Sequence, residues 1–200
     1  VRFISNNSSG KMGYAVAASA FQAGAEVTLI SGPTNLRPPR GIEFFAVTTA
    51  QEMLSEVERT VSRADIFIGV AAVSDYRPKI VQYDKIKRSS GSIQIELVPN
   101  PDILASVTGR TLPPFTVGFA AETTKLLENA KKKLKEKNVD LIVANNVGGT
   151  DTPFGEDFNS LTLFDHQNEI DLGYGSKQML ADRLISEIAP RYYEKNSSSN

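Results

Sequence analysis

The sequence of 200 residues contains no cysteine, so it can form no disulfide bond, supply no thiol nucleophile and bind no metal through sulfur. The charged side chains nearly cancel, with 22 Lys and Arg against 23 Asp and Glu, and no overall field draws the chain to nucleic acid. No apolar run reaches the roughly 20 residues that a membrane helix needs, and the first residues lack a signal-peptide pattern. We therefore expect a cytoplasmic protein that binds neither nucleic acid nor membrane.

Apolar runs of β-strand character alternate with helical patterns along the chain. Residues 65–72, 115–121 and 140–145 are nearly continuous in apolar side chains, which is typical of parallel strands buried on both faces. The alternation predicts a Rossmann-like, doubly wound α/β fold whose mostly parallel sheet is flanked by helices. Two more strands are expected at 26–31 and 42–47, and helices at 8–23, 48–63, 101–109, 124–137 and 178–193.

Two segments break the alternation. Residues 92–98 have the polar alternation of an exposed strand, and 161–164 with 169–172 flank a turn that predicts a hairpin and holds His166. These antiparallel segments either extend the sheet or pair between subunits. Residues 1–195 are expected to form a single domain and 196–200 a frayed tail. The abrupt start at Val1 suggests that a first strand lies upstream.

Polar residues follow the predicted strands. Ligands of open α/β sheets bind beyond the carboxyl ends of the strands, so these positions are candidates for a site. Ser5 to Lys11, Ser74 to Arg77, Glu122 and Asn145 all fall there.

The segment from Asn6 to Lys11 is the most specific of these signals. A Ser-Ser-Gly turn that leads into a helix leaves backbone N–H groups free, and the helix dipole favours an anion there. The alternative is an ordinary helix start with Ser8 or Ser9 as the N-cap. The segment lacks the spacing of a P-loop and the Gly-x-Gly-x-x-Gly dinucleotide fingerprint.

Other candidates have equally ordinary alternatives. Asp75 beyond a strand end suits a ribose-binding carboxylate, but is also a common turn residue. Lys85 and Lys87 would share one face of an extended strand, where they can bind a polyphosphate or form a solvated edge. Lys133 and Lys137 lie on one helix face, as nucleotide ligands or as solvated charges. His166 has no neighbouring cluster that predicts a metal site.

Several blocks in sequence order resemble the bacterial type of phosphopantothenate–cysteine ligase, a CTP-dependent family often fused to phosphopantothenoylcysteine decarboxylase. The blocks are Ile-Ser-Asn-Asn-Ser-Ser-Gly-Lys-Met-Gly at 4–13, Ala-Ala-Val-Ser-Asp-Tyr at 71–76, Lys-Ile-Lys at 85–87, Asn-Pro-Asp-Ile-Leu at 100–104, Gly-Phe-Ala-Ala-Glu-Thr at 118–123 and Ala-Asn at 144–145. They extend across nearly the whole chain.

The resemblance implies a two-step reaction. The carboxylate of 4′-phosphopantothenate attacks the α-phosphate of CTP, giving an acyl-cytidylate and pyrophosphate, with Mg²⁺ bound through the nucleotide phosphates and to no protein ligand. The amine of L-cysteine then displaces CMP, giving 4′-phosphopantothenoylcysteine for coenzyme A synthesis. The family is a homodimer that joins through antiparallel strands. Its members begin with a strand and a Thr-x-Gly-Gly-Thr turn, which are missing here.

The resemblance also implies roles for single residues. Asn6 would hold the acyl intermediate and assist its conversion to the amide, and Lys85 would bind the triphosphate in the first step. Arg2 would reach the active site near the dimer interface. The remaining nucleotide-binding residues would be Ser8, Ala71, Ala72, Asp75, Asn100, Pro101, Asp102, Ile103, Phe119, Lys133 and Lys137.

Two other functions remain open from the residues alone. A nicotinamide-dependent oxidoreductase also uses a Rossmann-like sheet, although the glycine fingerprint is absent. A non-catalytic module that dimerises and docks a fused decarboxylase would make Asn6 and Lys85 dispensable.

Overall fold

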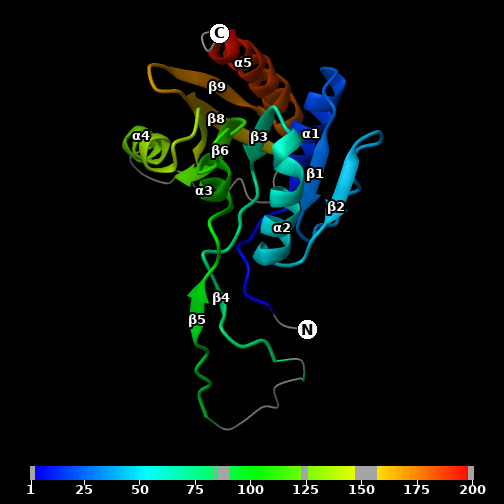
Figure 1. Ribbon diagram of the computed structural model, residues 1–200, viewed down its shortest axis with the longest axis vertical. Coiled ribbons are helices and arrows are strands. Elements are labelled where there is room, and N and C mark those ends of the chain that lie inside the picture. Colours follow the sequence, from blue (N-terminus) through cyan, green and yellow to red (C-terminus); the bar gives the residue numbers. More distant parts are fainter. Residues whose placement is uncertain (1–2, 83, 85–90, 123–125, 147–156, 198–200) are drawn as a thin grey trace.

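The computed structural model describes residues 3–82, 84, 91–122, 126–146 and 157–197. Its main sheet has five strands in the order β3 (Ile66–Gly69), β6 (Phe115–Glu122), β7 (Leu141–Asn146), β8 (Phe158–Phe164) and β9 (Glu169–Ser176). The first three strands are parallel, and the β8–β9 hairpin adds two antiparallel strands beside β7 (Figure 1). The predicted mostly parallel α/β sheet is confirmed, and the hairpin extends it.

Helices cover both faces of this sheet. On one face, α1 (Lys11–Gln22) and α5 (Lys177–Ser197) pack against each other and against Val117, Val143 and Leu163, all fully buried. On the other face, Leu134 of α4 (Leu126–Lys137) packs on Ile142 and Phe164. The central apolar runs therefore form strands buried on both sides, because each face meets a helix.

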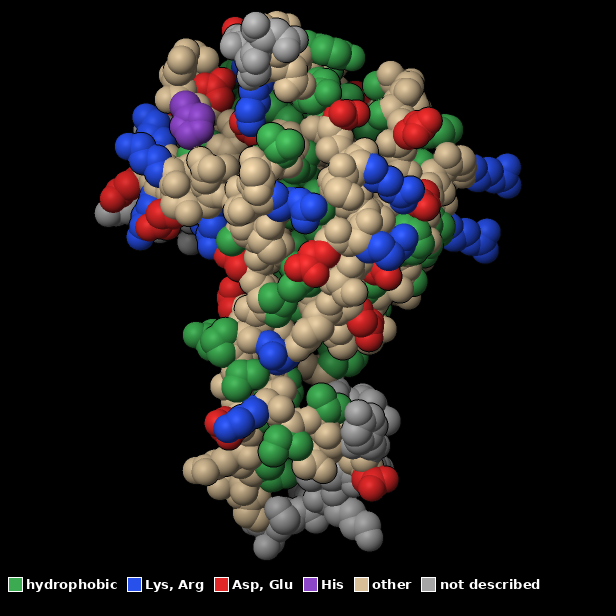
Figure 2. Space-filling model, viewed as in Figure 1, with side chains coloured by type: hydrophobic (Ala, Val, Ile, Leu, Met, Phe, Trp, Pro, Cys, Tyr) green, Lys and Arg blue, Asp and Glu red, His purple; other side chains and the backbone are tan. Residues whose placement is uncertain are grey.

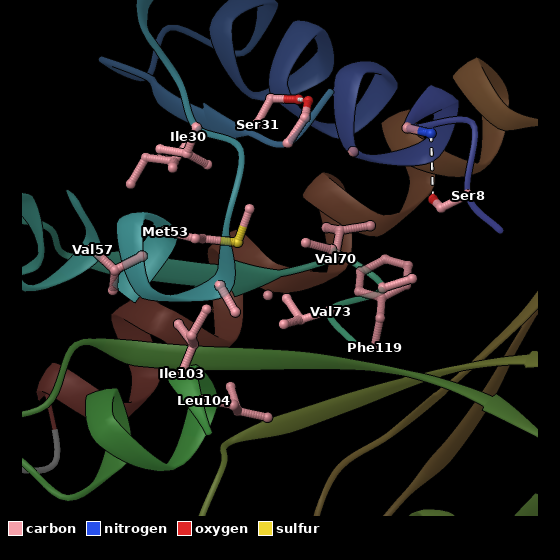
Figure 3. Close-up of a pocket in the computed structure, with 18 of the residues that line it drawn as sticks. Ser8, Ile30, Ser31, Met53, Val57, Val70, Val73, Ile103, Leu104 and Phe119 are labelled. Atoms are coloured by element: carbon pink, nitrogen blue, oxygen red, sulfur yellow. Dashed lines mark hydrogen bonds between the residues drawn. The ribbon is translucent and has the colours of Figure 1, made fainter. Parts of the chain in front are cut away.

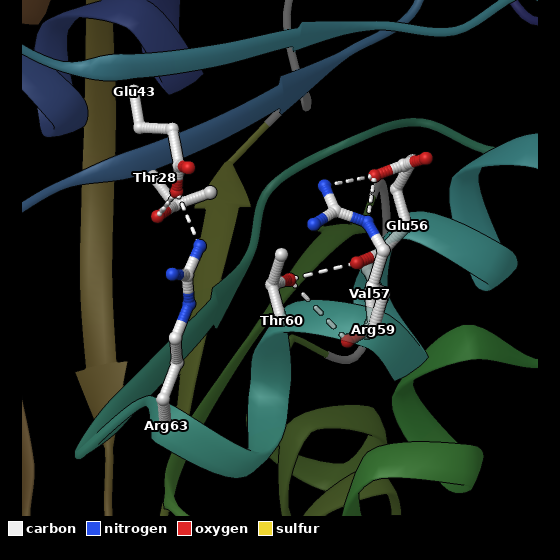
Figure 4. Close-up of polar contacts among 7 residues, drawn as sticks. All are labelled: Thr28, Glu43, Glu56, Val57, Arg59, Thr60 and Arg63. Atoms are coloured by element: carbon white, nitrogen blue, oxygen red, sulfur yellow. Dashed lines mark hydrogen bonds and ion pairs between the residues drawn. The ribbon is translucent and has the colours of Figure 1, made fainter.

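A second sheet pairs β1 (Thr28–Ser31) in parallel with β2 (Glu43–Ala46). Arg63, in the short 3-10 helix Val61–Arg63, binds Glu43 at 2.6 Å, and Glu43 accepts a hydrogen bond from Thr28 at 2.8 Å (Figure 4). The hydrogen bond from Thr28, with the Arg63 charge, lowers the pKa of Glu43. Strand β1 does not pair with β3, and a cleft separates the two sheets.

The starts of α2 and α1 differ in how they are capped. α2 (Ala50–Thr60) begins after Thr49, whose side chain accepts from Glu52 N–H while Glu52 accepts from Thr49 N–H, a capping box. α1 begins at Lys11, and its N-cap is Gly10 in the left-handed region with no side-chain cap. The expectation of Ser8 or Ser9 as N-cap is therefore wrong.

A narrow arm extends from the body (Figures 1 and 2). It contains β4 (Tyr76–Pro78) paired antiparallel with β5 (Leu97–Pro99), so the strand expected at 92–98 is shorter and lies later. The arm exposes several large apolar side chains, Tyr76, Ile80, Val81, Ile93, Ile95 and Leu97. Among the described residues, no helix combines the length and apolarity required to cross a bilayer.

Candidate functional site

One large cleft opens at the carboxyl ends of β3, β6 and β7 and continues between the two sheets. Its volume is about 3720 Å³, whereas a small-molecule pocket measures roughly 300–1,000 Å³. Figure 3 shows Ile30 of β1, Met53 and Val57 of α2, Val70 after β3 and Phe119 of β6 facing into it. The cleft therefore has an apolar slot between the two sheets and a polar end, lined by Asn6, Ser8, Asp75 and Asn100.

Asn6 lies at the polar end of this cleft. Its side-chain amide donates a hydrogen bond to the carbonyl of Val73 at 3.2 Å, which places it beside the segment that follows β3. Ala71 and Ala72 belong to the same segment, where Val73 N–H bonds to Ala71 C=O in a tight turn. The structure thus brings together two blocks that lie more than 60 residues apart.

The turn before α1 depends on Gly10, which lies against the loop that contains Thr34. Gly10 has φ +75°, and a Cβ on it would lie 2.7 Å from the Thr34 side chain. The Ser8 hydroxyl accepts from Gly10 N–H at 3.4 Å and Ser9 from Lys11 N–H at 3.5 Å, both weak contacts. The first-turn amides of α1 consequently keep their capacity to bind an anion.

Asn100 connects the arm to the site. Its backbone N–H donates to Asp75 C=O and its side-chain amide to Ser74 C=O, both at 2.8 Å. The carboxylate of Asp75 is exposed, as a ribose-binding role requires. Arg77 of β4 donates to the carbonyl of Pro99 and stands 3.5 Å from Asn100 Oδ1. Asn100 and Asp75 are therefore held side by side.

Asp102 joins two helices at the next position. It is the N-cap of α3 (Ile103–Thr108), accepting from Ala105 N–H at 2.9 Å, and its second oxygen pairs with the ammonium of Lys137 at the end of α4. Burial acts to raise the pKa of Asp102, but the hydrogen bonds from Lys137 and Ala105 outweigh it and hold the pKa below its usual value. Lys137 is thus held against Asp102, at the start of α3.

The remaining predicted residues divide into three groups. Pro101, Phe119 and Lys133 line the cleft. Ile103 lines it too and packs on the Val57 cluster beneath. Arg2 and Lys85 lie outside the described residues, so their places in the site stay predictions.

Three polar residues of the cleft were missed as candidates or given no role: Asn145, Asn159 and Lys177. Asn159 and Lys177 are buried, and the side-chain oxygen of Asn145 is also buried. Asn159, near the start of β8, and Lys177, just after β9, belong to no recognisable sequence motif. Their signal would have been the antiparallel hairpin itself, which returns these positions to the carboxyl edge of β7.

The described residues contain no group of three His, Asp or Glu side chains arranged to hold a metal ion. The polar end instead presents amides, backbone groups, hydroxyls and lysine ammonium groups. Such donors bind phosphates and stabilise charge that develops on them.

Comparison with known proteins assigns the class. Residues 1–192 match the family described as DFP, the DNA/pantothenate metabolism flavoprotein C-terminal domain, and the chain belongs to this family. It is 47% identical over 193 residues to the coenzyme A biosynthesis bifunctional protein CoaBC of Haemophilus influenzae, and 45% identical over 200 residues to that of Escherichia coli K12.

These alignments cover 96% and 98% of this chain. They cover 48% and 49% of the relatives, so the chain spans about half the length of the proteins it matches. The crystal structure of the C-terminal domain of a CoaBC protein superposes with a TM-score of 0.82 at 38% identity, covering 97% of this chain and 88% of that one. A flavoprotein of the same description from Streptococcus pneumoniae, at 23% identity and TM-score 0.80, shares the fold.

Proposed function

We propose that this domain ligates 4′-phosphopantothenate to L-cysteine with CTP, through an acyl-cytidylate, to give 4′-phosphopantothenoylcysteine, CMP and pyrophosphate in the cytoplasm. The main support for this proposal is that almost the entire chain is 45–47% identical in sequence to proteins named for coenzyme A biosynthesis. The preference for CTP rests on the resemblance of the motif blocks to bacterial members.

The chemistry of the cleft supports this proposal. Forming a mixed anhydride from a carboxylate and a nucleotide requires positioning and charge neutralisation more than a protein nucleophile. The cleft has Asn6 beside the 71–75 segment, Asp75 for the ribose and Lys137 for phosphate oxygens. Mg²⁺ would enter on the nucleotide phosphates, whose oxygens are the ligands it prefers, and would neutralise their charge.

A nucleotide panel tests the reaction. CTP, ATP, GTP and UTP are each supplied with 4′-phosphopantothenate, L-cysteine and Mg²⁺, and pyrophosphate and the amide product are measured. We expect rapid turnover with CTP. Absence of turnover with every nucleotide, in the full-length protein that carries this domain, would contradict the ligase.

Two substitutions separate the half-reactions. Asn6→Asp replaces the neutral amide, which donates hydrogen bonds, by a negatively charged carboxylate, which only accepts them. We therefore expect pyrophosphate release to continue and amide formation to stall. Lys85→Gln removes a charge assigned to the triphosphate, so pyrophosphate release should fall by about 100-fold or more. Asn35→Asp and Lys131→Gln make the same changes at exposed positions outside the cleft lining and should leave both steps intact. Normal product formation by either test variant would refute its assigned role.

The domain's partners follow from the same relatives. They are named bifunctional proteins, which supports a fused or associated decarboxylase beside the ligase.

The apolar arm supports a homodimer in which the arms of two subunits pair, because isolated pairs of three-residue strands are unstable alone. Sedimentation of the purified protein should show twice the chain mass.

The apolar slot supports one more strand in the domain. Within the part of the chain that the structure describes, β1 and β3 each pair with a single neighbour, and residues 28–31 and 66–69 line the slot. A strand from outside this sequence would join the two sheets into one and cover the apolar lining.

A further inference from the structure

Three hydroxyl groups join the end of β1 to the first turn of α1. Tyr14 OH donates to Ser31 Oγ at 3.2 Å and accepts from Thr34 Oγ1 at 3.3 Å. Ser31 Oγ donates onward to the carbonyl of Gly32 at 2.9 Å, and Thr34 Oγ1 accepts from Leu36 N–H at 3.2 Å. Each hydroxyl therefore donates one hydrogen bond and accepts one, so the three groups form a single directed chain.

Tyr14 is the central member of this chain. Its side chain is buried, with 9% of its surface exposed. A buried hydroxyl costs free energy unless it is hydrogen-bonded, and replacing it by an apolar group can be nearly neutral for stability. A phenylalanine would fill the same space and need no partner. What the hydroxyl of Tyr14 adds is direction, because it fixes the place of Thr34 relative to α1.

The turn at residues 8–10 has little support from its own hydrogen bonds. Among the described residues no side chain caps α1, and the Ser8 and Ser9 hydroxyl groups accept only at 3.4 Å and 3.5 Å. Gly10 instead lies against the loop after β1, where an added Cβ would stand 2.7 Å from Thr34 Cγ2 and 3.7 Å from Leu36 Cδ1. The loop therefore supports the turn, and Thr34 makes the tightest contact.

These groups adjoin the polar end of the cleft. Gly10, Tyr14, Ser31 and Thr34 all line the cleft, and Figure 3 shows Ser31 beside α1. A phosphate at the start of a helix is bound by several backbone amides at once, and none of these can turn independently of the others. A small shift of the turn would lengthen all of these hydrogen bonds together, and misplacement by about 1 Å can be severe.

We propose that Tyr14 is a positioning residue for the nucleotide: through Thr34 it fixes the turn at residues 8–10, whose amides bind the phosphates of CTP. This inference rests on the proposed ligase function. The hydroxyl of Tyr14 acts on how tightly the phosphates are held and takes no part in the chemical steps. An interaction that is equally strong in the ground state and the transition state changes KM and leaves kcat unchanged. The hydroxyl chain is thus a determinant of nucleotide affinity.

The test is Tyr14→Phe in the full-length protein that carries this domain. The readouts are KM for CTP in pyrophosphate release and, independently of turnover, the Kd of CTP by calorimetry. Both should rise roughly 3- to 10-fold, a modest factor because the two hydrogen bonds of Tyr14 are long for hydroxyl groups. The kcat and the KM for L-cysteine should stay the same. Tyr174→Phe is the matched control, since Tyr174 is 72% exposed and lies outside the cleft lining.

A second variant tests the connection between the two residues. Thr34→Val keeps a methyl group against Gly10 and removes the hydroxyl, so it should raise KM for CTP by a similar factor. The double variant should be no worse than either single one, because both changes remove the same hydrogen bond. Thermal unfolding checks that each variant folds.

Each outcome decides the matter. If Tyr14→Phe folds and binds CTP as tightly as the wild type, or lowers kcat with KM unchanged, the inference is wrong. Additive effects in the double variant would show that Tyr14 does not act through Thr34, which also overturns it. If the wild-type protein neither binds CTP nor releases pyrophosphate from it, the proposed function fails instead.

Discussion

Gly10 sets the direction in which the chain enters α1. Its left-handed backbone lets the turn at residues 8–10 expose its amides, and the absence of a Cβ lets the loop after β1 approach. Thr34 in that loop is fixed by hydrogen bonds, donating to Tyr14 OH at 3.3 Å and accepting from Leu36 N–H at 3.2 Å. A side chain at position 10 would therefore meet a neighbour that cannot easily move.

Gly10→Ala should lower the free energy of unfolding by about 1–2 kcal/mol from backbone strain, with a further loss from the contact with Thr34. Gly24→Ala is the matched control, because Gly24 has φ +92° but no atom within 4 Å of the added methyl. Urea denaturation of both variants measures the difference. Equal destabilisation of the two would show that Thr34 yields and that only the backbone matters.

The β8–β9 hairpin depends on one turn residue. Asp165 accepts from the N–H groups of Gln167 at 2.8 Å and Asn168 at 2.6 Å, and Arg191 of α5 stands 3.4 Å from its other oxygen. Burial acts to raise the pKa of Asp165, but these hydrogen bonds hold that pKa below its usual value. The ionised form therefore ties the turn to α5.

Asp165→Asn should destabilise the protein by about 1–2 kcal/mol at pH 7. Because the folded pKa is depressed, the wild-type advantage is present above the unfolded value near 3.9 and is lost as pH falls through the folded pKa. Thermal unfolding from pH 7 to pH 2.5 should show the two curves converging. Glu169→Gln, an exposed neutralisation in the same hairpin, should not reproduce this convergence.

The long elements were predictable from the sequence, whereas the short ones were not. The buried runs at 115–121 and 140–145 became strands because apolar continuity leaves few alternatives. β4 was not predicted, because its three residues, one of them proline, are too few to show a periodic pattern. The cap of α1 was misjudged because Ser8 and Ser9 are the usual cap types, whereas the helix starts after Gly10, whose left-handed backbone cannot be read from residue type alone.

The candidate site was predictable only where residues lie in continuous blocks. The rule that ligands bind at carboxyl strand ends located Asn6, Asp75 and their neighbours. The contacts that join these blocks, such as Asn6 with Val73, need the fold. Lys177 was not predictable, because its burial arises only when α5 packs beside α1.

At the scale of the whole molecule, β1 and β3, the edge strands of two sheets, flank an apolar slot. An added strand would bury several apolar side chains, each worth about 1.5–3 kcal/mol, against a backbone entropy cost of about 1–2 kcal/mol per residue. The net gain should be a few kcal/mol. A strand in the slot would therefore stabilise the domain.

We expect a longer piece of the same protein, extended before Val1, to unfold at higher denaturant than the 200-residue chain. Hydrogen exchange should slow at the backbone amides of β1 and β3 while β9, at the far edge, remains unchanged. As a control, two Asp substitutions on the apolar positions of the added segment should abolish the gain. Equal stability of the two lengths would contradict a joining strand.

The hydrogen bonds from Asn100 to Ser74 and Asp75 have a consequence for the order in which parts of the molecule fold. β4 and β5 contain three residues each, too few to persist as an isolated pair, and Asn100 holds their base against Ser74 and Asp75. The arm can therefore form only after the body has brought the end of β3 and the start of α3 together. The strand pair then forms outward from this base, so the end of the cleft at Ser74 and Asp75 is complete before the arm is.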